Sequence, residues 1–101
     1  MKTKTRTLAE FKSKLKAIKP VLKRRYKVET IAVFGSYTRG EQTPKSDLDV
    51  LISFSEPIGV YKFAEVEEFL SKKLAIKVDL VEKGALLPMI KEQVISETIT
   101  I

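Results

Sequence analysis

The chain of 101 residues has the length of one domain, and its 44% hydrophobic and 32% charged residues exclude a disordered tail. It contains no Cys and no His. Disulfides, thiolate or imidazole metal sites and Ser-His-Asp or Cys-His catalysis are therefore excluded, and any bound divalent ion should be a hard one such as Mg²⁺. The sequence has neither the roughly 20 apolar residues of a membrane-spanning helix nor a secretory signal, so we expect a single cytoplasmic domain over residues 1–101.

The net charge of +6 is unevenly distributed along the chain. Residues 1–27 contain eleven Lys or Arg and one acidic residue, whereas residues 28–101 contain eight Lys or Arg and twelve Asp or Glu. A basic segment on an acidic body can attract nucleic acid, an anionic nucleotide or an acidic protein. It can equally be a solvated helix face that keeps the protein soluble, and the charge pattern leaves these interpretations open.

The first predicted element is an amphipathic helix that begins after Thr7 and ends near Tyr26. Thr7 is a candidate N-cap, and Glu10, three residues later, completes a capping box. Pro20 should kink this helix or split it into two segments. The apolar positions recur every three or four residues, at Leu8, Phe11, Leu15, Ile18, Leu22 and Tyr26.

Two strands are predicted next, separated by a polar loop. Residues 28–34 are rich in β-branched and aromatic side chains and end at Gly35, which is typical of a strand. Residues 36–46 contain Ser, Thr, Gly and Pro and predict a loop with room for one helical turn. Residues 47–54 are apolar on both faces beyond Asp49, as expected of a central strand covered by helices on at least one side.

The second half of the chain alternates helix and strand. Residues 61–74 have helical spacing of apolar side chains, and residues 76–81 alternate apolar and polar as a third strand does. A last helix is predicted from about Pro88 to near Glu97, followed by a β-branched end, residues 98–101, that forms an edge strand or a docked tail. The pattern predicts an α/β (α+β) domain, with a small mixed sheet of three to four strands flanked by three to four helices.

The chemistry-bearing residues are concentrated where the first two strands are joined. In a strand, Asp47 and Asp49 project from the same face, and two adjacent carboxylates attract a hard cation. Gly35 lets the backbone approach a phosphate without a Cβ in the way, and Ser36 adds a hydroxyl and an N–H beside it. Taken singly, these residues are also typical of a turn and of solvated strand ends, so the combination carries the prediction.

A third carboxylate, Asp79, lies on the third predicted strand between Val78 and Leu80. A carboxylate beside apolar neighbours on an apparent interior strand is unfavourable unless it is paired or metal-bound. If the third strand lies beside the second, Asp79 can reach ions held by Asp47 and Asp49. Three carboxylates could then hold two ions about 4 Å apart, an arrangement that supports in-line phosphoryl transfer.

The segment GSYTRGEQTPKSDLDVLISF resembles the signature of the DNA polymerase β-type nucleotidyltransferase superfamily. The shared pattern is Gly35-Ser36, ten intervening residues and Asp47-Leu48-Asp49, and it is most similar to the minimal nucleotidyltransferase (MNT) branch. The resemblance covers most of the chain and implies the polymerase β-like nucleotidyltransferase fold.

The resemblance also implies roles for individual residues. Gly35 and Ser36 would hold the β and γ phosphates of a nucleoside triphosphate such as ATP. Asp47 and Asp49 would ligate two Mg²⁺ ions, and Asp79 would complete the metal site and accept the proton of the attacking hydroxyl.

Two basic residues are further candidates for contact with the triphosphate. These are Arg39 and Lys45, although Arg39 could instead brace the loop against Glu41.

About 100 residues leave little room for a site that binds the acceptor, so we expect a separate protein to supply it. MNT proteins are similar to antitoxins paired with HEPN-domain ribonuclease toxins, and some transfer AMP from ATP to a toxin Tyr hydroxyl. The leading hypothesis is a Mg²⁺-dependent protein adenylyltransferase that acts as an antitoxin. The alternatives are an antitoxin that masks its toxin by stoichiometric binding, and a small nucleic-acid-binding module that uses the basic N-terminal segment.

Overall fold

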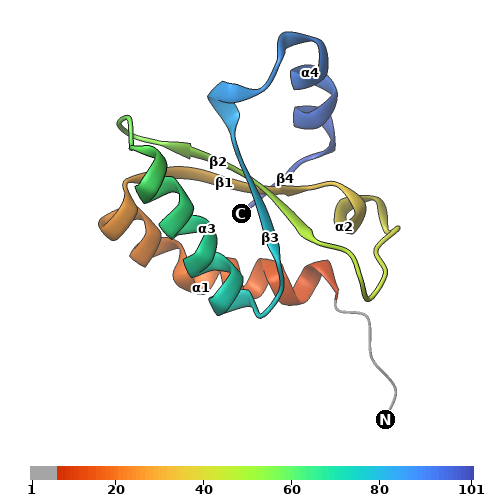
Figure 1. The fold of residues 1–101 in the computed structure, drawn as a ribbon. Coiled ribbons are helices and arrows are strands. Elements are labelled where there is room, and N and C mark those ends of the chain that lie inside the picture. The colour runs from red at the N-terminus through yellow and green to blue at the C-terminus, as the bar shows by residue number, and fades with distance from the viewer. Residues whose placement is uncertain (1–6) are drawn as a thin grey trace.

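Four strands form one sheet, in the order β3-β2-β1-β4, in the computed structural model, which describes residues 7–101 (Figure 1). They are β1 (Val28–Phe34), β2 (Leu48–Phe54), β3 (Val78–Glu82) and β4 (Ile99–Thr100). β1 pairs antiparallel with both β2 and β4, and β2 pairs parallel with β3. The predicted small mixed sheet is thus confirmed, with residues 98–101 contributing an edge strand.

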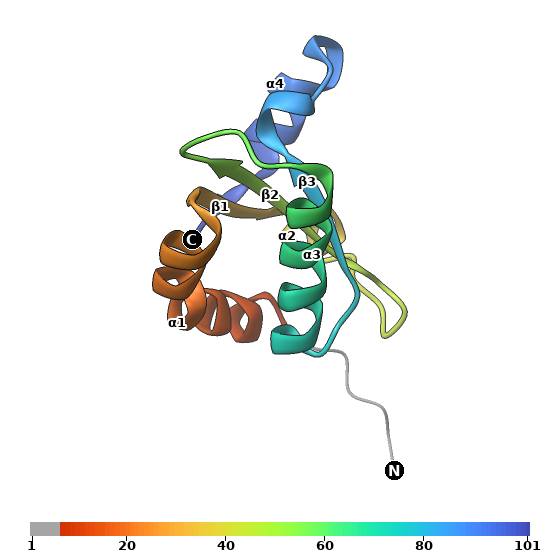
Figure 2. The ribbon, with the colours of Figure 1, turned by 60° about the vertical axis from the view of Figure 1, so that its left-hand side comes forward.

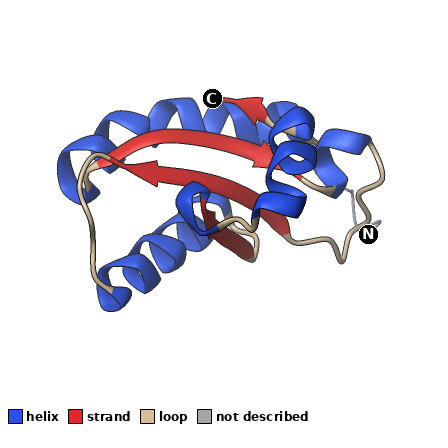
Figure 3. Ribbon diagram, turned by 90° about the horizontal axis from the view of Figure 1, so that it is seen from above, coloured by secondary structure: helices blue, strands red, loops and turns tan. Residues whose placement is uncertain are grey.

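The helices are distributed unequally over the two faces of this sheet. Helices α1 (Leu8–Tyr26) and α3 (Val60–Leu74) form a layer on one face, whereas α4 (Pro88–Glu97) lies on the opposite side (Figures 1 and 2). A single helical turn, α2 (Ser36–Arg39), follows β1, and a 3-10 turn (Lys83–Ala85) follows β3. Viewed from the α4 side, that helix covers only part of β1 and β2 (Figure 3). None of the helices over residues 7–101 is long and apolar enough to cross a membrane.

Helix α1 begins as its sequence predicts. The Thr7 hydroxyl accepts a hydrogen bond from the Glu10 N–H at 3.4 Å, which is one half of a capping box. The helix remains continuous through Pro20, so the alternative of two separate segments is wrong. It ends at Tyr26, and the capping residue that follows, Lys27, adopts the left-handed conformation with φ 61°.

The core lies between the sheet and the α1–α3 layer. Leu48, Val50 and Ile52 of β2 are fully buried there, so the intervening residues of β2 face the other side of the sheet. Helix α3 contributes three fully buried side chains and α1 contributes four with exposure of 2% or less: Val66, Leu70, Leu74, Phe11, Leu15, Leu22 and Tyr26. This alternation turns Asp49 away from the core.

Helix α4 matches its predicted range, but β3 differs in place and environment from the expectation. β3 occupies Val78–Glu82 rather than residues 76–81, and it is an edge strand with β2 on one side only. Asp79 is accordingly exposed, so the prediction of an interior strand around it is wrong. A strand at the edge of a sheet, with one face not covered by the core, can carry a carboxylate without a buried partner.

Candidate active site

Gly35 joins β1 to the α2 turn, and its backbone lies next to the carboxylate of Asp49. Its φ of 81° lies in the region that favours glycine, and its carbonyl accepts hydrogen bonds from the Thr38 hydroxyl at 2.8 Å and the Thr38 N–H at 3.1 Å. A Cβ at position 35 would stand 2.1 Å from Asp49 Oδ2. The absence of a side chain at position 35 therefore allows the Asp49 carboxylate to pack directly against the backbone.

The register of two neighbouring strands brings Asp49 and Asp79 together. Asp49 of β2 is paired directly with Asp79 of β3. Residues paired in this way project to the same side of the sheet, here the side opposite the α1–α3 layer. The condition on which the three-carboxylate prediction depended, β3 lying beside β2, is thus met.

The crowding of these carboxylates changes the titration of Asp49. The pKa of Asp49 is raised to about 6, first by desolvation and then by the negative charge and hydrogen bonding of Asp79 and the charge of Asp47, against a smaller lowering by Arg39. A carboxylate with this environment binds a proton or a cation more readily than an isolated one does.

A pocket of about 580 Å³ lies over this pair of carboxylates. One wall is polar and includes Gly35, Arg39, Asp49 and Asp79. The opposite wall belongs to α4 and the segment before it, and its residues are Leu86, Ile90, Gln93, Val94 and Glu97. The pocket therefore combines acidic groups with an apolar wall, which suits a ligand that has both a charged and a flat apolar part.

Three of the predicted residues do not line this pocket. Lys45 is exposed in the loop before β2, where its N–H donates to the Thr43 hydroxyl at 3.2 Å. Asp47 lies just before β2 and forms an ion pair with Lys77 at 3.9 Å, although its charge still acts on Asp49. Ser36, the first residue of α2, is half-buried next to Gly35.

Arg39 is held by two carboxylates. Its guanidinium contacts Glu41 at 2.6 Å and Glu97 of α4 at 3.5 Å, and its pKa is raised, chiefly by the hydrogen bond with Glu41. The contact with Glu41 is the bracing interaction that the sequence offered as an alternative. Glu97 was not predicted, because a contact between residues 58 positions apart has no local signal in the sequence.

The donor set fits a hard divalent cation. The pocket region offers carboxylate oxygens, the chain has no His or Cys to favour a softer metal, and a cation would relieve the repulsion that Asp79 and Asp47 exert on Asp49. Within residues 7–101, however, no three acidic side chains stand close enough to form a ready-made metal cluster. The side chain of Asp47 would have to turn from Lys77 to join the other two.

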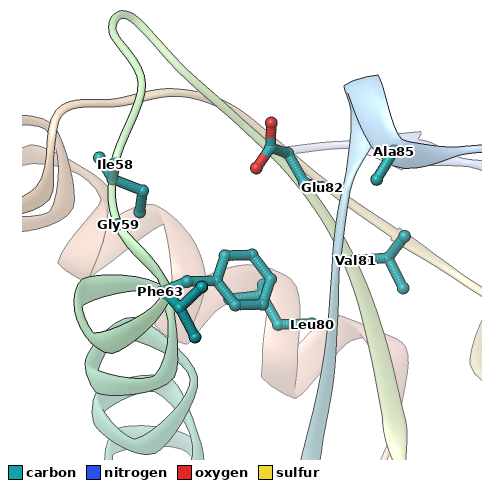
Figure 4. A pocket seen from close by; sticks show the side chains of 8 residues that line it. Ile58, Gly59, Phe63, Leu80, Val81, Glu82 and Ala85 are labelled. Carbon is teal, nitrogen blue, oxygen red and sulfur yellow. The ribbon is translucent and has the colours of Figure 1, made fainter.

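A second hollow, of about 370 Å³, lies near the start of α3 and contains little that could bind a phosphate (Figure 4). Apolar side chains dominate it, including Ile58, Phe63 and Leu80, and Glu82 contributes the one charged group among its lining residues. Since neither Gly35 nor the predicted carboxylates reach it, we assign the functional site to the pocket over Asp49 and Asp79.

Residues 15–101 match the family model of the nucleotidyltransferase domain. The chain belongs to this family. It is 51% identical over 90 residues to a Methanocaldococcus jannaschii protein named as a candidate protein adenylyltransferase, a match that covers 88% of this chain and 92% of that protein. It is also 44% identical over 93 residues to the protein adenylyltransferase MntA of Thermococcus cleftensis, covering 92% of this chain and 94% of that one.

Comparison with solved structures agrees with this family assignment. A structure named as a candidate minimal nucleotidyltransferase has a TM-score of 0.80 and 31% identity, and the match covers 96% of this chain and 98% of that chain. A toxin–antitoxin complex with AMP-PNP has a TM-score of 0.71 and 26% identity, with 86% of this chain and 70% of that chain covered. The nucleotidyltransferase fold and activity that the signature implied are confirmed.

Proposed function

We propose that this nucleotidyltransferase is a Mg²⁺-dependent protein adenylyltransferase that acts as an antitoxin. It transfers AMP from ATP to a hydroxyl group, of Tyr for preference, on a HEPN-domain ribonuclease toxin. The observation that carries the proposal is the close packing of Gly35 against Asp49, with Asp79 in register beside it. The names of its relatives, protein adenylyltransferases and a toxin–antitoxin complex with AMP-PNP, support the choice of nucleotide and partner.

Each polar group of the site has a part in this reaction. Asp47, Asp49 and Asp79 would hold two Mg²⁺ ions, which supply charge neutralisation at the triphosphate when bound. Gly35 and Ser36 bind the β and γ phosphates beside these carboxylates.

The two basic residues act at the triphosphate. Arg39 leaves Glu97 to contact it. Lys45 is exposed outside the pocket. It therefore contacts only the terminal phosphate of a triphosphate that extends out of the site.

The chemical step is a substitution at the α-phosphorus. The acceptor oxygen forms a bond to the α-phosphorus, the bond to the bridging oxygen of the β-phosphate breaks, and pyrophosphate leaves. Asp79, exposed at the sheet edge where an incoming hydroxyl can reach it, accepts the proton of that hydroxyl. The single domain of residues 1–101 supplies the nucleotide site, and the partner supplies the acceptor.

The test is transfer of label from α-labelled ATP to the co-expressed toxin in the presence of Mg²⁺. We expect the wild type to label the toxin, and the double variant Asp47→Asn, Asp49→Asn to lose labelling while remaining folded. Absence of transfer by the wild type, or undiminished transfer by the double variant, would contradict the proposal. Toxin neutralisation that survives loss of all three carboxylates would favour an antitoxin that works by binding alone.

A further inference from the structure

The outer edge of β3 is occupied by side chains of α3. β3 has β2 on one side only, so the N–H groups of alternate β3 residues point away from the sheet. Two of these N–H groups have partners: Val78 donates to Ser71 Oγ at 3.0 Å, and Leu80 donates to Glu67 Oε2 at 3.0 Å. The two bound amides belong to the residues on either side of Asp79.

The spacing of helix and strand allows both hydrogen bonds to form together. Glu67 and Ser71 are four residues apart and lie on one face of α3, which places them about 6 Å apart along the helix axis. Val78 and Leu80 are two residues apart in β3, which corresponds to about 6.6 Å along a strand. The helix and the strand run antiparallel and side by side (Figures 1 and 2), so one turn of α3 matches two residues of β3.

The hydrogen bonds of Glu67 and Ser71 to β3 also bear on the direction in which the Asp79 side chain points. A slip of β3 by one residue would move every side chain to the opposite face of the sheet, and Asp79 would leave the face that carries Asp49. Such a slip would also break the hydrogen bonds that the β3 amides donate to α3. The half-buried oxygens of Glu67 and Ser71 would then lose their donors.

We infer that Glu67 and Ser71 are positioning residues that keep β3 in register with β2 and thereby hold the Asp79 carboxylate beside Asp49. The inference rests on the proposed function, because it assigns Asp79 a place in the metal and proton chemistry of that site. Outer partners that orient metal ligands commonly change metal affinity or activity by 10–100-fold when they are removed, about the range expected here. The contrasting possibility is that these side chains only protect the sheet edge and affect stability alone.

The decisive variants are Glu67→Met and Glu68→Met. Met and Glu have similar helix propensities, and Glu68 is exposed and pairs with Lys72 on the same helix, so the second variant is a matched control without a contact to β3. Well below the unfolding temperature, we expect E67M to lower both Mn²⁺ affinity and the kcat of transfer by about tenfold or more, with KM for ATP little changed. E68M should retain both values.

Conservative variants provide the rescue test. Glu67→Gln keeps an acceptor oxygen and should retain Mn²⁺ affinity and kcat. Ser71→Ala should lower both by less than E67M does, because it removes a single neutral hydrogen bond, whereas Ser71→Thr keeps the hydroxyl and should restore them.

Amide hydrogen exchange measured by NMR gives a readout that does not require activity. We expect the amide of Leu80 to exchange faster in E67M, and that of Val78 in S71A, with wild-type rates in E68M. Unchanged exchange, or equal metal affinity and kcat in E67M and E68M, would overturn the inference. A wild type that transfers no AMP would contradict the proposed function instead, while Mn²⁺ affinity and exchange rates would still decide the roles of Glu67 and Ser71.

Discussion

At the scale of single residues, the contact between Gly35 and Asp49 leaves no room for a side chain at position 35. Gly35→Ala would place a Cβ 2.1 Å from Asp49 Oδ2, in a backbone conformation of φ 81° that L-residues rarely adopt. We expect the variant to lose nucleotidyl transfer by more than about a hundredfold and to unfold at a lower temperature, measured by labelled-ATP transfer and calorimetry.

Gly59→Ala is the matched control for this prediction. Gly59 has φ −76°, and a Cβ there would meet nothing within 4 Å. Its activity should stay within about twofold of the wild type, since no charge or contact at the site changes. A G35A variant as active as G59A would contradict the assigned role of Gly35.

The raised pKa of Asp49 predicts a pH dependence of stability in the metal-free protein. The folded state binds a proton at Asp49 up to a pKa of about 6, whereas the unfolded chain releases it near 3.8. The folded state therefore binds more protons between these values, and this contribution to stability falls as the pH rises from about 4 to 7.

Asp49→Asn removes this contribution and should stabilise the metal-free protein at pH 7. The gain should be about 1 kcal/mol, because the side chain is half-buried and water screens part of the repulsion. Urea unfolding in EDTA at pH 4, 5.5 and 7 measures it as the difference between variant and wild type. A difference that does not change with pH would show that Asp49 titrates normally.

The pairing of Asp49 with Asp79 is the part of the site that sequence could predict only conditionally. The spacing of Asp47 and Asp49 predicted that both side chains lie on one face of a strand. The signature predicted that Gly35 lies beside the carboxylates. Nothing in the local pattern indicated that Asp47 would pair with Lys77, because that contact depends on how β3 is joined to β2.

At the scale of elements, periodicity predicted what each segment is more reliably than where it lies. Helix α4 was predicted with its observed bounds because Pro88 opens it. The sequence pattern did not reveal that α4 forms a wall of the pocket. The helix buries no side chain, so it has no packed face that a pattern of apolar residues would identify. The edge position of β3 was missed for a related reason: strand order is set by long-range pairing.

The ion pair between Arg39 and Glu97 means that Glu97 competes with the triphosphate for the Arg39 guanidinium. Glu97→Gln should remove one of the two ion pairs of Arg39, leaving that with Glu41, and lower the KM for ATP by roughly two- to fivefold, because exposed ion pairs contribute little. Glu92→Gln makes the same charge change at an exposed position of α4 that does not line the pocket. Steady-state kinetics of both variants with ATP would test this, and equal KM values would show that Glu97 does not restrain Arg39.

At the scale of the whole molecule, helix α1 and the pocket over Asp49 and Asp79 lie on opposite sides of the sheet. Helix α1 packs on one side of the sheet, and α4 lies on the other side (Figures 1 and 2). Residues of α4 line the pocket together with Asp49 and Asp79. A helix with its side chains is about 10–12 Å thick, which exceeds the Debye length of about 8 Å at physiological salt. The lysines on the outer side of α1 therefore act on bound nucleotide only weakly.

Charge reversal on α1 should separate catalysis from nucleic-acid binding. Lys14 and Lys16 are exposed, and the double variant Lys14→Glu, Lys16→Glu should keep kcat/KM for ATP within about twofold at 0.15 M salt. If the basic segment instead binds RNA, the variant should lose that affinity, and the affinity of the wild type should fall steeply between 50 and 200 mM salt by fluorescence anisotropy. A large loss of kcat/KM in the variant would contradict the separation of the two faces.

The short connection between α3 and β3 carries an evolutionary consequence. Residues 75–77 join a helix and a strand whose side chains are matched to each other, so a one-residue insertion or deletion that shifted β3 along β2 would turn Asp79 to the opposite face. Residues 55–59 connect β2 to α3, and a change of length there leaves the connection between α3 and β3 intact. We therefore expect descendants of this chain to tolerate changes of length in residues 55–59 better than in residues 75–77.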